Sequence, residues 1–279
     1  MEAKDFRHVG MWTAFRPEVL FRDYLDGTGI THIIGGFCPA KSIRRNAPEG
    51  GRGLMWFSGE AGGEPYIPFK PEYPGAIEFS YQRSSIPGRT VWYPGFMSSL
   101  DELCSPKKVC REDFVRRANA IVFLCSNRYH WRGRGKPLVD WRIVFSKRLA
   151  ASGMRVDSAG RFAPTMPKIP KADTFPFISG RRFMLCSENA ETPGYFTEKA
   201  VNAWRGGAIP IYRGAPDAHE YLNPDAAIIL DAGSDAGEVA KRLAAMDESE
   251  WVHRASQPLF QPWVRSLGRE VRELTLKMI

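Results

Sequence analysis

The residues with the clearest potential for chemistry lie at positions 187–214, in the segment SENAETPGYFTEKAVNAWRGGAIPIYRG. We predict that Thr197 is the N-cap of a helix, so that Glu198 and Lys199 fall in its first turn. A lysine there is unfavourable beside the positive end of the helix dipole and requires an anion or an acidic neighbour. A nucleotide diphosphate would satisfy Lys199, and Glu198 could accept hydrogen bonds from ribose hydroxyls. If only these two residues are considered, an exposed Glu/Lys pair on a surface helix is the simpler interpretation.

The elements around this segment predict a parallel sheet. Short apolar strands alternate with helices, which is typical of βαβ units. We expect strands at 120–125, 154–156, 182–187, 208–212 and 226–230, and helices at 112–117, 139–151, 197–205 and 235–246. Such sheets bind ligands beyond the carboxyl ends of their strands, where helices begin. The segment at 187–214 has that position in the fold.

The first part of the chain is rich in loops that contain glycine and proline. An apolar run at 9–15 and a helix at 17–25 precede short strands, which we expect at 31–34, 54–57, 76–79 and 91–93. Because the chain has 279 residues, of which 43% are hydrophobic, it can form two domains of roughly 100 to 150 residues with a core each.

Composition also restricts the environment and the partners. The N-terminal segment builds no continuous hydrophobic stretch, and the longest apolar runs are too short to span a bilayer, so we expect a soluble intracellular protein. The five cysteines show no zinc-ligand spacing; we expect reduced thiols, with a Cys104–Cys110 disulfide as the alternative. A net charge of +8 indicates an anionic partner, namely a nucleotide phosphate, nucleic acid or a membrane surface.

A longer pattern makes the segment at 187–214 recognisable. The run E-N-x-x-x-x-x-Y-x-T-E-K-x-x-x-A-x-x-x-G-A-I-P-I-Y-x-G at 188–214 resembles the donor-binding signature of glycosyltransferase family 10, the α-1,3/1,4-fucosyltransferases. Shorter blocks are similar to other parts of the family: FSGE at 57–60, AIEFSYQR at 76–83, VWYP at 91–94, CSN at 125–127, Arg142 with Leu149, and VDSAG at 156–160.

The resemblance implies an α/β protein of the GT-B fold, in which two Rossmann-like, doubly wound domains face each other. It places an acceptor-binding domain at 1–118, a GDP-sugar-binding domain at 119–250, and a C-terminal helix at 251–279 that packs back on the first domain. The implied reaction is an inverting transfer of fucose from GDP-fucose to a glycan hydroxyl in an α-1,3 or α-1,4 linkage.

The resemblance also implies roles for particular residues. Glu60 would be the general base that takes the proton of the acceptor hydroxyl, with Glu64 as its nearest competitor. Arg142 and Lys199 would neutralise the departing diphosphate, and Arg132 or Arg134 could take the place of Arg142. The remaining donor-binding residues would be Glu188 close to the sugar, and Asn189, Tyr195, Thr197 and Glu198 around the ribose and phosphates.

Glycosyl transfer needs stabilisation of the leaving group, by a divalent metal or by fixed cations. The chain contains no Asp-x-Asp sequence, so we expect no protein-held metal and no strict metal requirement, although a divalent ion could stimulate the reaction.

Three alternatives remain open at this stage. The family's Phe-Glu-Asn-Ser is Ser187-Glu188-Asn189-Ala190 here, so another GDP-sugar is the first alternative. The second alternative is a nucleic-acid-binding protein. Against it, the aromatic residues of this chain do not interleave with its basic clusters, as they do where bases stack on a protein surface. The third alternative is a non-catalytic sugar-binding relative.

The C-terminal segment has a partly amphipathic stripe. Its apolar members are Trp263, Val264, Leu267, Val271, Leu274 and Leu276, with Arg265, Arg269 and Arg272 elsewhere on the turn. We expect a final helix that packs on the first domain; the alternative is peripheral contact with the inner face of the cytoplasmic membrane. The sequence does not indicate an oligomeric state.

Overall fold

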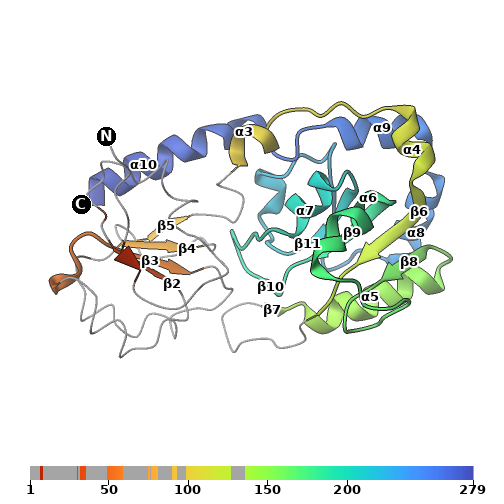
Figure 1. Cartoon of the computed structure of the whole chain (residues 1–279), viewed down its shortest axis with the longest axis horizontal. Helices are drawn as coiled ribbons and strands as arrows, with labels where there is room; N and C mark the ends of the chain where they lie inside the picture. Colours follow the sequence, from red (N-terminus) through yellow and green to blue (C-terminus); the bar gives the residue numbers. More distant parts are fainter. Residues whose placement is uncertain are drawn as a thin grey trace.

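The computed structural model describes residues 7–8, 30, 32–35, 49–58, 75, 77–80, 90–92, 99–126 and 136–278. Two five-stranded sheets lie in two lobes, at the left and right of Figure 1. The apolar run at 9–15 and the helix at 17–25 that we predicted fall outside the described residues.

The first sheet consists of parallel strands in sequence order, β1-β2-β3-β4-β5. Its strands are β1 (Arg7–His8), β2 (His32–Gly35), β3 (Leu54–Ser58), β4 (Ile77–Ser80) and β5 (Thr90–Trp92), with a short 3-10 helix η1 (Glu49–Gly51) before β3. The four strands predicted in this lobe are confirmed to within one residue at each end, because each is a short apolar run bounded by glycine or proline.

The second sheet has the order β12-β11-β9-β6-β8, and its strands are parallel. They are β6 (Ala118–Phe123), β8 (Arg155–Ser158), β9 (Arg181–Ser187), β11 (Ile209–Arg213) and β12 (Ile228–Ile229). A two-stranded antiparallel ribbon, β7 (Lys136–Pro137) with β10 (Ala190–Glu191), stands beside the sheet. Two residues per strand are too few for a sequence pattern, so this ribbon was not predicted.

Helices cover both faces of the second sheet because successive strand residues point to opposite sides. Phe123 and Phe183 belong to one core cluster, whereas their neighbours Val122 and Met184 belong to the other. The first cluster includes residues of α5 (Val139–Ala151), α8 (Ala236–Ala245) and α9 (Glu248–Ser256). The second includes residues of α6 (Thr174–Ser179) and α7 (Lys199–Arg205).

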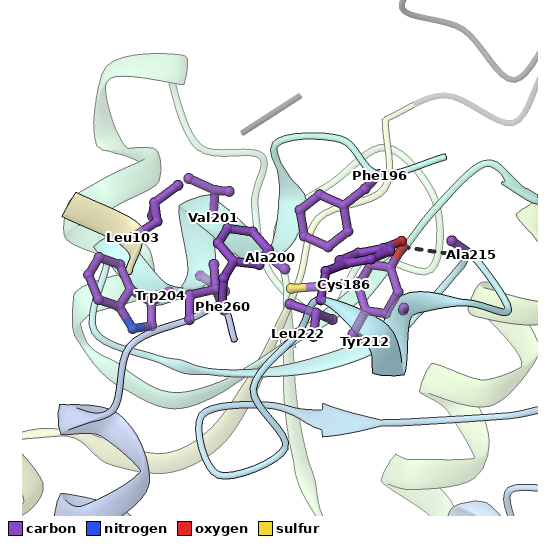
Figure 2. Close-up of a cluster of buried hydrophobic side chains, with 14 of the residues drawn as sticks. Leu103, Cys186, Phe196, Ala200, Val201, Trp204, Tyr212, Ala215, Leu222 and Phe260 are labelled. Carbon is purple, nitrogen blue, oxygen red and sulfur yellow. Dashed lines mark hydrogen bonds between the residues drawn. The ribbon is translucent and has the colours of Figure 1, made fainter. Parts of the chain in front are cut away.

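Figure 2 shows the cluster on the α7 face of the sheet. Val201 and Trp204 of α7 lie near Phe260, and Phe196 stacks on Tyr212 with ring centroids 5.2 Å apart. The lobe is therefore doubly wound, as predicted, and its sheet is buried on both faces, which explains why the apolar stretches of β6, β9 and β11 show no alternation with polar residues.

The remaining elements connect the two lobes. The helices α3 (Leu100–Leu103) and α4 (Arg111–Arg116) precede β6, and α10 (Leu267–Met278) follows η6 (Pro262–Ser266) and passes beside β5 (Figure 1). Val264, Leu267 and Val271 of the predicted C-terminal stripe are buried, whereas Leu274 and Leu276 are exposed. Short 3-10 helices η4 (Lys171–Asp173) and η5 (Ala218–Glu220) complete the second lobe.

Two expectations are corrected by the described residues. Cys104 and Cys110 are both free thiols, so the alternative disulfide is wrong. We expected one C-terminal helix at 251–279, but α9 already begins at Glu248 and ends at Ser256, and η6 and α10 follow it as separate elements. The N-cap of α9, Asp247, accepts a hydrogen bond from the Glu250 amide at 2.8 Å. Among the helices that the structure describes, none is long and apolar enough to cross a membrane.

Gly160, which follows β8, yields a first prediction. A Cβ at this position would lie 2.5 Å from the amide nitrogen and 2.6 Å from the carbonyl oxygen of Cys125, a buried residue shortly after the end of β6, and these are backbone atoms rather than the end of a flexible side chain. We expect Gly160→Ala to lower the free energy of unfolding by about 1–3 kcal/mol, measured by urea unfolding followed by circular dichroism. Gly233→Ala is the matched control, because the nearest atom to its Cβ would be 3.6 Å away. Equal urea midpoints for the two variants would contradict the prediction.

Candidate functional site

Glu188 stands at the carboxyl edge of the second sheet, directly after β9. Its amide donates to the carbonyl oxygen of Arg213, the last residue of β11, at 2.8 Å, so the pairing of the two strands continues into the site. The Glu188 side chain is fully buried. A buried carboxylate is costly unless donors surround it, so the environment of Glu188 must supply them.

Thr197 and Lys199 supply those donors. The Thr197 amide donates to Glu188 Oε1 at 2.8 Å, and the Thr197 hydroxyl donates to Oε2 at 2.7 Å. Lys199 Nζ donates to the same Oε2 at 2.8 Å and to Thr197 Oγ1 at 2.8 Å. These three residues form one closed network, which we call the Glu188 network.

The predicted role of Thr197 as helix N-cap is wrong. The N-cap of α7 is Glu198, which makes no side-chain cap hydrogen bond, and α7 begins at Lys199. The hydroxyl and the amide of Thr197 are instead taken by Glu188, because a charged carboxylate is a stronger acceptor than the alternatives near a helix end. The predicted end of the helix at the pair Gly206-Gly207 is confirmed.

Lys199 keeps its positive charge in this setting. Burial opposes the charge, but the carboxylates of Glu188 and Glu198 outweigh that cost and raise the pKa of Lys199 above its ordinary value. The charge of Lys199 is the main cause that lowers the pKa of Glu198, which is exposed. About a quarter of the Lys199 side chain, 23%, remains open to solvent. The acidic neighbour that the sequence required is therefore Glu188, and part of the Lys199 side chain is still accessible from outside.

Arg142 and Asn189 form a second pair beside this network. Arg142, in the first turns of α5, is buried, and its Nη1 donates to the Asn189 side-chain oxygen at 3.0 Å. The Asn189 carbonyl oxygen accepts from the amide of Leu138, the N-cap residue of α5, at 3.0 Å. Because Asn189 follows Glu188 directly, the two groups of polar side chains share one edge of the sheet.

The other predicted site residues differ in placement. The Tyr195 side chain is 1% exposed and belongs to the core cluster on the α7 face. Glu60, Glu64, Arg132 and Arg134 lie outside the described residues, and their roles stay predictions. Within the part of the chain that the structure describes, no group of three or more His, Cys, Asp or Glu side chains could hold a metal ion.

Comparison with known proteins places this site in a family. Residues 119–257 match the family described as glycosyltransferase family 10 (fucosyltransferase) C-term. Residues 119–257 form a domain of glycosyltransferase family 10. The matched residues contain the Glu188 network and the Arg142–Asn189 pair, and the resemblance seen in the sequence is confirmed.

Individual relatives are similar over parts of their length. GDP-fucose protein O-fucosyltransferase 3 of Danio rerio is 32% identical over 81 residues, which are 28% of this chain and 18% of that protein. Alpha-(1,3)-fucosyltransferase 7 of Rattus norvegicus is 34% identical over 125 residues, which are 42% of this chain and 33% of that protein. The chain therefore matches between 18% and 33% of the length of these curated relatives.

A solved structure confirms the GT-B fold. The crystal structure of an alpha1,3-fucosyltransferase with GDP-fucose matches with a TM-score of 0.60, over 88% of this chain and 77% of that one, at 16% identity.

Sequence reasoning missed two features of this family 10 site. Gly214 is required because a Cβ there would lie 2.5 Å from Glu188 Cγ and 2.4 Å from the Tyr212 hydroxyl. Arg213, buried at the end of β11, forms an ion pair with Glu191 of β10 at 2.7 Å. Both lie within the recognised pattern, and a charged residue followed by glycine at the end of an apolar strand is the signal that could have found them.

The loop that leads to Thr197 is fixed from two sides. The Gly194 amide donates to Asp217 Oδ1 at 2.8 Å, and the Gly194 carbonyl oxygen accepts from the Trp92 indole at 3.0 Å. Gly194 has a φ of 71°, which favours glycine. Because Trp92 belongs to β5, this hydrogen bond joins the first sheet to the site of the second.

The Glu188 network yields a second prediction. Thr197→Val removes the hydroxyl that both donates to Glu188 and accepts from Lys199, and leaves the buried carboxylate short of a donor. We expect the free energy of unfolding to fall by about 1–3 kcal/mol in urea titrations. Thr197→Ser keeps the hydroxyl and serves as the control, with a smaller loss. If the valine variant unfolded at the wild-type urea concentration, Thr197 would not support the network.

Proposed function

We propose that the protein transfers fucose from GDP-fucose to a hydroxyl of a glycan acceptor, with inversion at the anomeric carbon. The observation that carries the proposal is the Glu188 network, which holds a charged and partly exposed Lys199 at the carboxyl edge of the second sheet. Ligands of open α/β sheets bind at this edge. The names of the relatives, which include GDP-fucose and α-1,3-fucosyl transfer, support the choice of donor.

Lys199 and Arg142 would act on the leaving group. When the bond between the sugar and the β-phosphate breaks, the diphosphate gains negative charge, and fixed cations stabilise that charge without reorganisation. Asn189, Thr197 and Glu198 would contact the phosphates and ribose, Tyr195 would support them from the core, and Glu188 would lie close to the sugar. The Glu188 network positions the ammonium before the donor arrives.

Glu60 would act on the nucleophile. The acceptor oxygen attacks the anomeric carbon, GDP departs with the electron pair of the broken bond, and the hydroxyl proton passes to the Glu60 carboxylate. One displacement of this kind inverts the anomeric configuration. We propose that the reaction needs no metal ion strictly, although a divalent cation could stimulate it.

The acceptor class is the least constrained part of the proposal. We propose a glycan such as the GlcNAc of a lactosamine-type or lipopolysaccharide chain, in an α-1,3 or α-1,4 linkage. Transfer of another sugar from its GDP derivative is the second candidate, because Ser187 and Ala190 replace the aromatic and hydroxyl residues of the family pattern. Ser187 is buried, and its hydroxyl donates to the Glu188 carbonyl oxygen at 3.2 Å, so this substitution lies against the network.

We also propose the setting in which the enzyme acts. The acceptor-binding domain would span 1–118, the donor-binding domain 119–250 and the C-terminal segment 251–279. The protein would be cytoplasmic, and α10 could add peripheral contact with the inner membrane face, since Leu274 and Leu276 are exposed beside basic residues of the same helix.

A donor panel tests the function. The purified chain is incubated with GDP-fucose, GDP-mannose and related donors in the presence of a chelator, with and without lactosamine-type acceptors, and release of GDP is measured. We expect release that depends on GDP-fucose and on the acceptor. Preference for another GDP-sugar would favour the second candidate, and loss of turnover with rescue by a divalent ion would contradict the independence from metal.

Glu60 yields a fourth prediction. We expect Glu60→Gln to lower kcat by about 100-fold or more, because a positioned base contributes roughly that factor, while the Kd for GDP-fucose stays unchanged. Glu64→Gln, four residues further on in the sequence, is the matched control and should retain activity. Full activity of Glu60→Gln would remove Glu60 from this role.

A further inference from the structure

A pocket of about 520 Å³ opens at the edge of the second sheet opposite to the Glu188 network. Its lining includes Arg117, Ser179 and Gly207, which stand shortly before β6, β9 and β11 respectively. Because these strands are parallel, the pocket lies at their amino ends. The seven residues of β9 separate the two edges by about 20 Å, at about 3.3 Å per residue. The pocket is therefore distinct from the proposed donor site.

The lining of this amino-edge pocket is strongly basic. Asp113 is its single acidic side chain, against the cationic side chains of Lys107, Lys108, Arg116, Arg117 and Arg205. Arg116 is paired with Asp113, and Arg205 is paired with Glu102. The charges of the other three cations are not balanced by an ion pair among the described residues.

Arg117 and Lys107 have only neutral partners there. Arg117 is 6% exposed; its Nη1 donates to the Gly206 carbonyl oxygen at 3.0 Å and to that of Arg181 at 3.3 Å. Its Nε is buried and has no hydrogen-bond partner in the described part of the chain. Lys107 Nζ donates to the Trp204 carbonyl oxygen and lies 4.0 Å from the centre of the Trp204 ring.

Capping of α7 explains part of this arrangement. The carbonyl groups of Trp204 and Gly206 lie at the C-terminal end of α7, where cations are favourable. Capping does not require Lys108, however, which is exposed and bonds to neither carbonyl. Nor does it explain Phe175, which lines the same pocket while 47% of it is exposed. An aromatic surface beside several cations suits a ligand that has both an organic part and negative charge.

We propose that the amino-edge pocket binds a phosphate-bearing molecule other than the sugar donor, with the phosphate between Lys107, Lys108 and Arg117 and the organic part against Phe175. The volume matches the range of about 300–1,000 Å³ that is usual for small-molecule sites. The phosphate could belong to a soluble phosphate ester or to the headgroup of an anionic lipid.

Binding of this anion should depend on pH. Burial first, and then the charge of Arg117, lower the pKa of Lys107 to about 8, while Glu102 and Asp113 oppose the shift. A bound phosphate favours the charged form of the Lys107 ammonium. At a pH at which free Lys107 is neutral, binding therefore requires that Lys107 take up a proton. The affinity should therefore fall as the pH rises through about 8.

Calorimetric titration with inorganic pyrophosphate tests the proposal. Excess GDP is present, so that the proposed donor site is filled. We expect one saturable site whose affinity is lower at pH 9 than at pH 7. Lys108→Glu should weaken it at least tenfold while the capping contacts of Lys107 and Arg117 stay intact. Lys241→Glu, an exposed change on α8 outside the pocket, is the matched control and should bind as the wild type does.

A second arm distinguishes the two sources of phosphate. Vesicles of phosphatidylcholine with and without phosphatidic acid are sedimented with the wild type and with both variants. If the wild type sediments only with vesicles that contain phosphatidic acid, and Lys108→Glu does not, the ligand is a lipid headgroup. If the wild type binds pyrophosphate but does not sediment with these vesicles, the ligand is a soluble phosphate ester. If pyrophosphate bound equally to the wild type and to Lys108→Glu, or to neither of them, the proposal would be overturned, whatever the result of the fucosyltransferase assay.

Discussion

The buried carboxylate of Glu188 is the constraint on which the site depends. It lies at the end of the central strand β9, out of contact with water, and an unpaired charge there would cost about 3–5 kcal/mol. Thr197 and Lys199 must therefore lie within hydrogen-bond distance of the Glu188 carboxylate. This requirement fixes both the path of the loop before α7 and the direction in which α7 leaves the sheet. Gly214 must lack a side chain because a Cβ there would lie 2.5 Å from Glu188 Cγ.

The two lobes and the two edges of the second sheet are connected through this arrangement. Trp92 of the first sheet holds the Gly194 loop from one side, and Asp217 holds it from the other. The helix α7 runs from Lys199 to the glycine pair at 206 and 207, where Lys107 and Arg117 bind its last carbonyl groups. The Gly194 loop and α7 are thus held at both ends by hydrogen bonds, and they keep the charged side chain of Lys199 at the edge of an apolar core.

Sequence patterns predicted the sheets well because buried parallel strands are apolar on both faces. They predicted α5 and α7 from amphipathic spacing, but not α6, α9 or the β7–β10 ribbon, which are short or lack a clear apolar period. Glu198 and Lys199 were singled out by their position at the start of a helix. Arg142 and Asn189 were found through the family pattern, each by itself, and their mutual hydrogen bond was not predicted. The true partner of Thr197 was not, because a contact between a strand end and a residue nine positions later depends on the path of the loop. Glu60 remains known from sequence alone.

A crystal structure of the chain with GDP would test the central claim most directly. We expect the diphosphate to lie at the carboxyl edge of the second sheet, with a phosphate oxygen within about 4 Å of Lys199 Nζ, while the Glu188–Lys199 contact persists. Diphosphate density remote from Lys199, with the Glu188 network unchanged, would contradict it and reduce that network to a structural ion pair.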